Sequence, residues 1–353
     1  MKVVLISSGV LPVPVKGYGG LEQIVYDLAI CLDKQGHEVF VVAPPESEVA
    51  NEGNIKLLIN DPPLPACNSN AHWWEYESYN RYRPLMDSEE FKDAVWHDHS
   101  WKKFTYLAKM QNSNLKVCST LHGMLPYQTP PPIERPCMIG ISKSHADQMA
   151  SGLGIPVKYV YNGIDIDKYF INGNNRNGRF LFLGRITTYK GPHIFIDIMK
   201  ENGYRGDIVG DDALVEDPAF VDRVLIMCNN YPNVRYWGEM ARQRCIEMLQ
   251  QAKAYISPLL PNWQEPFGLS IIEAMACGTP VIATKNGSIP ELIEHGVSGY
   301  VVETTHDISK YLTDEALSKI TAENCRKQAE KFSRENMCNN YLALYGKVLE
   351  GGW

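Results

Sequence analysis

The chain of 353 residues is long for a single hydrophobic core and has a length that suits two domains. Apolar residues make up 44% and charged residues 21%, which is typical of a globular protein. A net charge of −7 without basic runs argues against nucleic acid as a partner. No apolar stretch is long enough to cross a bilayer, and Met1–Ile6 runs into serine and glycine too early for a signal peptide. We therefore expect a cytoplasmic protein without a transmembrane segment, for which peripheral membrane contact stays open.

Nine cysteines are spread along the chain without a Cys-x-x-Cys pair. Several of them, such as Cys31, Cys118 and Cys277, stand in apolar surroundings. An odd number without paired spacing argues against both a disulfide framework and a zinc site. We expect reduced cysteines in the core.

The first residues predict a βαβ unit. Lys2–Ser8 is an apolar strand, apolar residues recur at helical spacing from Leu21 until Gly36 ends the run, and Glu38–Ala43 is the next strand. The loop before the helix ends in Gly17-Tyr18-Gly19-Gly20. Glycines at a helix start let a phosphate or a sugar approach the backbone, although such a loop is about as often a plain turn.

The segment from His72 to Tyr106 is rich in aromatic residues. Aromatic rings stack on sugars, which would make this segment an acceptor site, but helices with aromatic core faces are commoner. Within it, His97-Asp98-His99 places two histidines on one face of a strand, as in a metal site. The sequence shows no third ligand, so a structural role or a place at the rim of an active site is favoured.

Another candidate in this half is His122, which follows the apolar strand Val117–Thr120. Open α/β sheets hold their ligands at this end of a strand, although a lone histidine there can also be structural. Met138–Ser144 contains the last strand of the half, and a helix follows it.

The second half repeats the alternation of strand and helix after Asn172–Gly178, which we interpret as a linker. Arg179–Gly184 is an apolar strand, and Pro192 suits the first position of a helix. Arg185 and Lys190 flank the turn between the two. Two cations at such a turn can reach one anion, although each could also be an ordinary surface charge.

Glu265 opens a further strand-and-helix unit. Pro266 and Gly268 form a turn, Leu269–Cys277 consists of helix formers, and Val281–Thr284 is a short buried strand. The rest of the chain continues the alternation. Further strands are predicted within Asp207–Asp211, Val234–Gly238 and Gly299–Val302, and helices within Ser288–Ile293, Asp314–Phe332 and Arg334–Leu349.

Glu273 lies inside the helix that Glu265 precedes, and helical side chains lean toward the N-terminus, so we expect the two carboxylates to converge. The free N–H groups near Phe267, Gly268 and Leu269 and the helix dipole suit a phosphate. Two acids would repel a bare phosphate but suit a ligand with hydroxyls beside its phosphates, such as a nucleotide sugar. The alternative is a solvated loop glutamate and a glutamate on the helix surface.

Several of these motifs resemble one known family. Glu265-Pro-Phe-Gly-Leu with a second glutamate eight positions later resembles the Glu-x7-Glu signature of retaining GT-B glycosyltransferases of the group 1 or family 4 type. The order Gly-Arg185-Ile-x-x-x-Lys190-Gly is similar to the diphosphate-binding element of that family. Thr-x-His122-Gly resembles the family's element beside the donor sugar. Asn162-Gly-Ile-Asp resembles the segment in which the family's chain crosses into the second domain.

The resemblance implies a GT-B fold, in which two Rossmann-like, doubly wound α/β domains face a cleft. We expect an acceptor-side domain of residues 1–171, a donor domain of residues 172–333, and a C-terminal helix in residues 334–353 that returns to the first domain. Over the first domain the resemblance depends on Gly19, Gly20 and His122. Asp212 stands where the family often has glycine, which affects the details of that loop and not the fold.

The resemblance also implies residue roles. The expected catalytic residues are His122, Glu265, Arg185 and Lys190. The expected donor-binding residues are Gly19, Gly20, Arg185, Lys190, Trp237, Gly238, Glu265, Phe267, Gly268, Leu269 and Glu273. In these roles Arg185, Lys190 and the start of the helix bind the diphosphate. Glu273 binds the ribose, and Glu265 binds the donor sugar. The strand end at Trp237 binds the base.

The expected activity is transfer of a sugar from a nucleotide diphosphate donor, with UDP-glucose or another UDP-sugar as first choice, to a sugar, lipid-linked or small-molecule acceptor. Retention of configuration, no metal and no cofactor besides the donor are expected. Asp165-Ile-Asp167 has the form of a metal motif of the other glycosyltransferase fold but lies in the crossing segment. The alternatives are a nucleotide-sugar binding protein without catalysis and a GDP-mannose-dependent mannosyltransferase. A dinucleotide oxidoreductase is disfavoured, because Gly17–Gly20 lacks the Gly-x-Gly-x-x-Gly pattern.

Overall fold

The computed structural model describes residues 1–17, 19–59, 71–123, 137–172, 176–210 and 217–353, without the side chains of Ile59 and residues 71–74. The chain divides into two compact units. The first comprises Met1–Val15, Gly19–Gly163 and Arg334–Trp353, and the second Lys16–Tyr18 and Ile164–Ser333. The expected linker is described only in part, and Asp211 and Asp212 lie outside the described residues.

The first unit is built on a parallel sheet of seven strands in the order β3-β2-β1-β4-β5-β6-β7. These strands are β1 (Lys2–Ile6), β2 (Glu38–Ala43), β3 (Lys56–Ile59), β4 (Val95–Asp98), β5 (Lys116–Thr120), β6 (Met138–Gly140) and β7 (Lys158–Tyr159). The order reverses at β1, which pairs with β2 on one side and β4 on the other. This is a doubly wound sheet, in which the strand ends around the reversal point form the usual place for a ligand.

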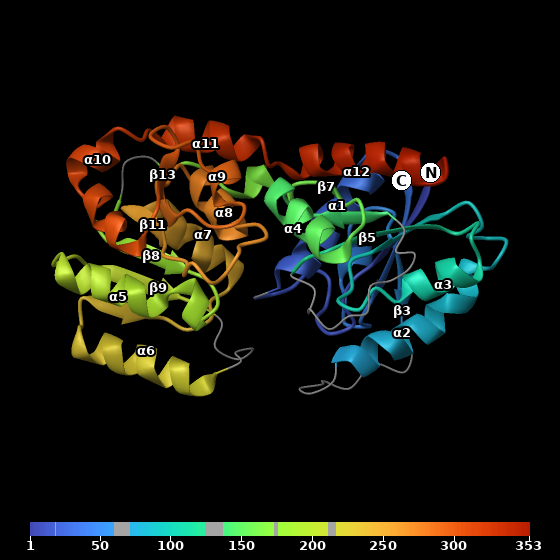
Figure 1. Cartoon of the computed structure of the whole chain (residues 1–353), viewed down its shortest axis with the longest axis horizontal. Coiled ribbons are helices and arrows are strands. Elements are labelled where there is room, and N and C mark those ends of the chain that lie inside the picture. Colours follow the sequence, from blue (N-terminus) through green and yellow to red (C-terminus); the bar gives the residue numbers. More distant parts are fainter. Residues whose placement is uncertain (18, 60–70, 124–136, 173–175, 211–216) are drawn as a thin grey trace. The chain divides into compact units, whose positions relative to one another are not determined.

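Five α-helices of the described chain belong to this unit (Figure 1). They are α1 (Gly20–Lys34), α2 (Ala71–Met86), α3 (Thr105–Gln111), α4 (Lys143–Leu153) and α12 (Arg334–Leu349). The C-terminal helix α12 packs against α1, and Nη1 of Arg334 lies 3.7 Å from Oδ1 of Asp27 on α1. The expected return of the last helix to the first part of the fold is confirmed.

Much of the aromatic segment forms the core of the first unit. Tyr79 and Tyr82 of α2 and Trp96 of β4 are buried, and the Tyr82 and Trp96 rings stack with their centroids 6.0 Å apart. Tyr76 and Trp101 remain 43% and 48% exposed. The described part of the segment therefore serves mainly to pack α2 against the sheet.

The second unit has a parallel sheet of six strands in the order β10-β9-β8-β11-β12-β13. Its strands are β8 (Phe180–Leu183), β9 (Gly206–Val209), β10 (Val234–Tyr236), β11 (Ala254–Ser257), β12 (Val281–Thr284) and β13 (Gly299–Val302). Its α-helices are α5 (Pro192–Glu201), α6 (Pro218–Asn230), α7 (Arg242–Gln251), α8 (Leu269–Ala276), α9 (Ile289–Leu292), α10 (Asp314–Ser318) and α11 (Ala322–Glu330).

The prediction of a single helix within Asp314–Phe332 is wrong, because the structure has two helices there, α10 and α11. Thr321 accepts a hydrogen bond from the N–H of Asn324 and so caps the start of α11, which begins a new helix at Ala322. Within the described residues, no helix combines the length and the apolar character that crossing a bilayer requires.

Candidate functional site

An ion pair between Lys190 and Glu265 lies at the centre of the candidate site in the second unit. Lys190 ends a short 3-10 turn, Thr188–Lys190, between β8 and α5, and Glu265 lies on the loop between β11 and α8. The Lys190 ammonium donates to Oε2 of Glu265, which is only 7% exposed. Two predicted site residues that are far apart in the sequence are thus brought into direct contact.

The backbone of Glu265 is held from the segment that follows β12. Its N–H donates to Oδ1 of Asn286 at 3.3 Å, and its carbonyl oxygen accepts from the N–H of Ser288 at 2.9 Å. Gly287 lies between them with φ +51°, and a Cβ atom there would come within 2.3 Å of the Glu265 carbonyl oxygen. Only glycine fits this close approach, so Gly287 helps to place Glu265.

Arg185 joins this cluster through two aromatic rings. Its guanidinium carbon lies 5.7 Å from the Tyr189 ring centroid, and Tyr189 stacks on Trp263 with centroids 4.1 Å apart. The Trp263 indole N–H then donates to Oε2 of Glu265 at 3.3 Å. The two predicted cations and the first predicted acid therefore belong to one packed cluster. Neither of its aromatic members was predicted from the sequence.

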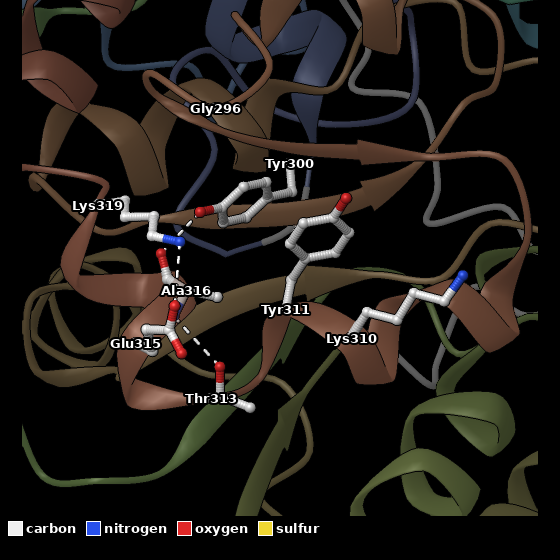
Figure 2. Close-up of a pocket in the computed structure, with 8 residues that line it drawn as sticks. All are labelled: Gly296, Tyr300, Lys310, Tyr311, Thr313, Glu315, Ala316 and Lys319. Carbon is white, nitrogen blue, oxygen red and sulfur yellow. Dashed lines mark hydrogen bonds and ion pairs between the residues drawn. The ribbon is translucent and has the colours of Figure 1, made fainter.

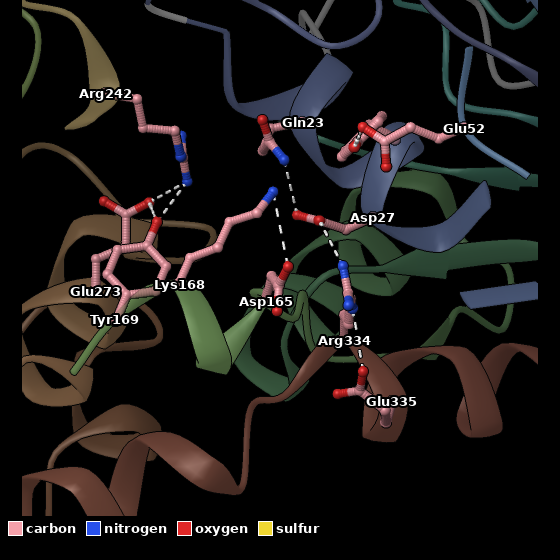
Figure 3. Close-up of polar contacts among 11 residues, drawn as sticks. Gln23, Asp27, Glu52, Asp165, Lys168, Tyr169, Arg242, Glu273, Arg334 and Glu335 are labelled. Carbon is pink, nitrogen blue, oxygen red and sulfur yellow. Dashed lines mark hydrogen bonds and ion pairs between the residues drawn. The ribbon is translucent and has the colours of Figure 1, made fainter. Parts of the chain in front are cut away.

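Glu273 of α8 has different partners, which Figure 3 shows. Its Oε1 accepts from the Tyr169 hydroxyl at 2.9 Å and from the Arg242 guanidinium at 2.5 Å. Arg242 also donates to the Tyr169 oxygen at 2.7 Å. Burial and the nearby Glu273 carboxylate raise the pKa of Tyr169 well above its usual range, so the phenol stays protonated and can donate. Arg242 and Tyr169 were not predicted from the sequence.

Tyr255 of β11 connects the surroundings of the two acids. Its hydroxyl donates to the carbonyl oxygen of Leu183 at 3.0 Å and lies 2.8 Å from Oγ of Ser270. Burial raises the pKa of Tyr255, and the negative charges of Glu265 and Glu273 raise it further. Both carboxylates therefore lie close enough to influence one phenol, although each is paired with its own cation.

Two helices begin beside these residues without a side-chain cap. Gly191 precedes α5 and Gly268 precedes α8, and neither of these N-cap residues makes a side-chain cap hydrogen bond. Leu269 is the first residue of α8, and Phe267 is buried just before it. Uncapped N–H groups and the positive end of the helix dipole are suited to an anion.

Trp237 and Gly238 follow strand β10 in the same unit. Trp237 is 42% exposed, and its indole N–H donates to Oδ1 of Asp207 at 3.0 Å. Arg179 holds the other oxygen of Asp207 at 2.7 Å, and the Gly238 carbonyl accepts from the N–H of Gly210 at 3.0 Å. The Trp237 side chain is therefore anchored at one edge while part of it faces solvent.

The remaining predicted residues, Gly19, Gly20 and His122, belong to the first unit. Helix α1 begins at Gly20, and Gly19 offers its N-terminus no side-chain cap. His122 lies two residues after β5, and its Nε2 is 2.9 Å from Nδ1 of His99. Burial lowers the pKa of His122 well below its usual range, so the ring is neutral near pH 7.

The described residues contain no group of three or more histidine, cysteine, aspartate or glutamate side chains that could hold a metal ion. Asp165, from the Asp-x-Asp segment, pairs with Lys168 at 3.6 Å. A separate pocket of about 340 Å³ lies in the second unit (Figure 2) and is lined by Gly296, Tyr300, Lys310, Tyr311, Thr313, Glu315, Ala316 and Lys319. None of the predicted site residues lines it.

Two doubly wound parallel sheets and a last helix that returns to the first unit define the GT-B fold. Solved structures match this fold over nearly the whole chain. Sucrose-phosphate synthase from Thermosynechococcus elongatus matches with a TM-score of 0.83 and 18% identity, and the match covers 100% of both chains. Anabaena HepE in complex with UDP-glucose matches with a TM-score of 0.74 and 17% identity, over 97% of this chain and 98% of that one.

Family models agree with the fold. The model described as glycosyl transferases group 1 matches residues 165–332, and the model described as Glycosyltransferase Family 4 matches residues 18–168. An uncharacterised glycosyltransferase of Methanocaldococcus jannaschii is 26% identical over 217 residues, which span 60% of this chain and 59% of that protein. The chain belongs to the group 1, family 4 glycosyltransferases, a retaining family of GT-B enzymes that use nucleotide-sugar donors.

Proposed function

We propose that this glycosyltransferase moves a hexose from a UDP-sugar, with UDP-glucose as the first choice, to an acceptor hydroxyl with retention of configuration and without a metal ion. The observation that carries the proposal is the Lys190–Glu265 pair beside the uncapped starts of α5 and α8. It offers a cation and helix N-termini for a diphosphate, next to an acid for sugar hydroxyls.

The leaving diphosphate gains negative charge as the bond between the sugar carbon and its oxygen breaks. Fixed positive partners stabilise that charge in the transition state. Lys190, Arg185 and the N–H groups of Phe267, Gly268 and Leu269 are proposed for this task. The acceptor oxygen forms the new bond to the sugar carbon, and its proton passes to the departing phosphate oxygen, so that no enzyme nucleophile is needed.

The acids are proposed to bind hydroxyl groups. Glu265 would accept from hydroxyls of the donor sugar, and its pairing with Lys190 would place sugar and diphosphate side by side. Glu273 would accept from the ribose hydroxyls, with Arg242 and Tyr169 fixing its carboxylate. Trp237 and Gly238 would contact the base.

The first unit is proposed to complete the site. His122 would lie against the donor sugar, and Gly19 and Gly20 would approach the donor phosphates and the acceptor. In this view residues 1–171 form the acceptor side, residues 172–333 the donor side, and residues 334–353 the returning helix. The acceptor is a sugar, a lipid-linked molecule or another small molecule, and contact with a membrane surface would follow from a lipid-linked acceptor.

The choice of a UDP-sugar is supported by Anabaena HepE, whose structure was solved with UDP-glucose. GDP-mannose is the main alternative donor, and donor binding without transfer is the alternative activity. Thermal melting of the full chain with UDP-glucose, UDP-galactose, GDP-mannose and ADP-glucose separates the donors, because a ligand bound by the native state raises Tm.

Release of the nucleoside diphosphate from the best donor, followed with and without acceptor and with EDTA, then tests the reaction. We expect turnover that EDTA leaves unchanged. Full loss of turnover in EDTA would contradict the metal-free proposal, and a Tm shift without any release of the nucleoside diphosphate would favour the binding protein.

A further inference from the structure

One tryptophan of the first unit is exposed although its backbone is firmly held. Trp101 lies on the loop between β4 and α3 and is 48% exposed. Its N–H donates to Oε1 of Glu75 at 2.7 Å, and the N–H of Lys102 donates to Oε2 of the same carboxylate at 2.6 Å. Glu75 belongs to α2 and is buried. Both oxygens of a buried acid from another element therefore hold this loop.

The rest of the loop is fixed in a similar way. Oδ1 of Asp98, at the end of β4, accepts from the N–H of Ser100 at 2.9 Å and from its hydroxyl at 2.6 Å. The hydroxyl oxygen of Ser100 accepts from the N–H of Lys103 at 3.3 Å, and the buried Lys103 ammonium donates to the Ser100 carbonyl oxygen. Each backbone N–H from Ser100 to Lys103 thus has a side-chain acceptor. These hydrogen bonds fix the loop without any contribution from the Trp101 ring.

This arrangement has energetic costs. Lys103 has φ +55°, in the left-handed region that a lysine rarely adopts. Burial raises the pKa of Glu75 to about 7 and lowers that of Lys103 to about 8, because it disfavours both charges. Strained backbone and buried charges around a surface loop are typical of loops that bind ligands. Here the side chain that the loop presents to solvent is Trp101.

The Trp101 ring lies beside the part of the first unit that is proposed to meet the donor sugar. Strands β4 and β5 are parallel neighbours, with Asp98 opposite Ser119, so the loops that follow them leave the same edge of the sheet. His122 and Gly123 follow β5. A Cβ atom on Gly123 would lie 3.4 Å from Cζ3 of Trp101, so the ring packs closely on this glycine. The strand ends near the reversal point at β1 are also the usual place for a ligand.

The surroundings of the ring favour a sugar over a lipid chain. The residue after Trp101 is the exposed Lys102, and the residue before Gly123 is the half-buried His122. A lipid chain needs a contiguous apolar surface. A pyranose ring has apolar C–H faces and polar edges, so it suits a flat indole that is set beside polar side chains.

We propose that Trp101 is an acceptor-binding residue whose ring stacks on a pyranose ring of the acceptor, next to His122, so that the acceptor is a sugar. Glu75 is then a positioning residue that acts through the backbone of Trp101. The statement that Trp101 binds a sugar concerns the protein alone. The statement that this sugar is the acceptor rests on the proposed function.

Binding is tested with the full chain labelled with 5-fluorotryptophan. In ¹⁹F NMR spectra the Trp101 signal is assigned by its loss in Trp101→Phe. The chain is titrated with the methyl glycosides of glucose, galactose and mannose, and with sorbitol, which has similar hydroxyl groups but no ring. We expect the Trp101 signal to shift with at least one glycoside and not with sorbitol.

Three results of the titration would overturn the proposal. They are no shift with any of the three glycosides, an equal shift with sorbitol, and a shift with phosphatidylglycerol vesicles alone. The last result would assign the ring to a membrane surface.

Kinetics with UDP-glucose and the glycoside that binds give a second readout. Trp101→Ala should raise KM for the glycoside about tenfold and Trp101→Phe about threefold, with little change in kcat, because a stacked ring holds the acceptor before and during transfer. Tyr159→Ala is the matched control, since Tyr159 is an exposed ring on β7 of the same unit, and should leave KM unchanged. An unchanged KM in Trp101→Ala would refute the acceptor role while the proposed function stands.

The role of Glu75 is tested by Glu75→Gln, which keeps the shape but turns an NH₂ group toward one of the two backbone N–H groups. It should raise KM for the glycoside about threefold in the unmodified chain and have no further effect in Trp101→Ala, because it acts through the ring. Equal rises in both backgrounds would contradict positioning through Trp101. If no donor releases its nucleoside diphosphate while the ¹⁹F shift persists, the proposed function fails and the sugar site stands.

Discussion

The two candidate acids of the second unit are charged and paired with cations, whereas the candidate histidine of the first unit, His122, is neutral and hydrogen-bonded to another ring. Lys190 pairs with Glu265 and Arg242 with Glu273, and all four belong to the second unit. His122 instead ends a chain of neutral rings in the first unit. A diphosphate needs full positive charges, while a sugar hydroxyl needs only a well-directed acceptor, so the difference matches the two parts of a nucleotide sugar.

The largest effect on this comparison is expected from removing a cation. Lys190→Met should lower kcat/KM about 10²- to 10³-fold, because the charge that forms on the diphosphate loses a fixed partner. The matched control is Lys285→Met, since Lys285 pairs with Glu303 at 2.9 Å in the same unit but both side chains are exposed. Steady-state kinetics decide, and near-normal rates in Lys190→Met would remove the diphosphate assignment.

The next effect is on stability. Gly287→Ala should lower the free energy of unfolding by about 3 kcal/mol, since an alanine there combines an unfavourable φ with a clash against the Glu265 backbone. Gly296→Ala is the control, because Gly296 has φ +77° and nothing within 4 Å of an added Cβ. It should cost only about 1 kcal/mol. Urea unfolding measures both, and equal losses would show that close approach to Glu265 is unimportant.

A smaller effect is expected from the partner of Glu273. Arg242→Met should raise KM for the donor about tenfold and change kcat little, because Arg242 orients an acid that binds the donor before and during the reaction. Arg244→Met, on the same helix and paired with the half-buried Glu247, should leave KM unchanged. A fall in kcat without a change in KM would place Glu273 in the chemical step instead.

The smallest effect concerns the neutral histidines of the first unit. His145 is buried, with Nε2 3.3 Å from the carbonyl oxygen of Gly123, and burial lowers its pKa from 6.5 to about 4. Between pH 6.5 and about 4 the His145 side chain is protonated in the unfolded chain but neutral in the fold. The free energy of unfolding is therefore highest above pH 6.5 and decreases as the pH falls through this range.

His145→Gln should therefore reduce the loss of unfolding free energy between pH 6.5 and 5.5 by about 1 kcal/mol. Urea unfolding at the two pH values measures this difference. Identical pH dependence in His145→Gln and the unmodified chain would contradict a neutral, buried His145.

The motif-bearing loops could be predicted from the sequence because each depends on neighbours within a few positions. Gly191 and Gly268 mark helix starts, and Glu265 stands on the loop before α8, as expected. Arg242, Tyr169 and Trp263 could not be predicted in this way. Arg242 and Tyr169 are 31 and 104 positions from Glu273, so only the packing of α7 and α8 brings them to that acid. Trp263 is two positions from Glu265, but its stacking on Tyr189 depends on the tertiary structure.

The sequence alone determined the alternation of strands and helices, the two doubly wound halves and the family, because these follow from local periodicity and short motifs. Only the tertiary structure decided which cation pairs with which acid and how Tyr345 of the last helix meets His97 of β4. The physical reason is that ion pairs and buried hydrogen bonds depend on distances of a few ångströms between residues that the chain separates by up to 248 positions.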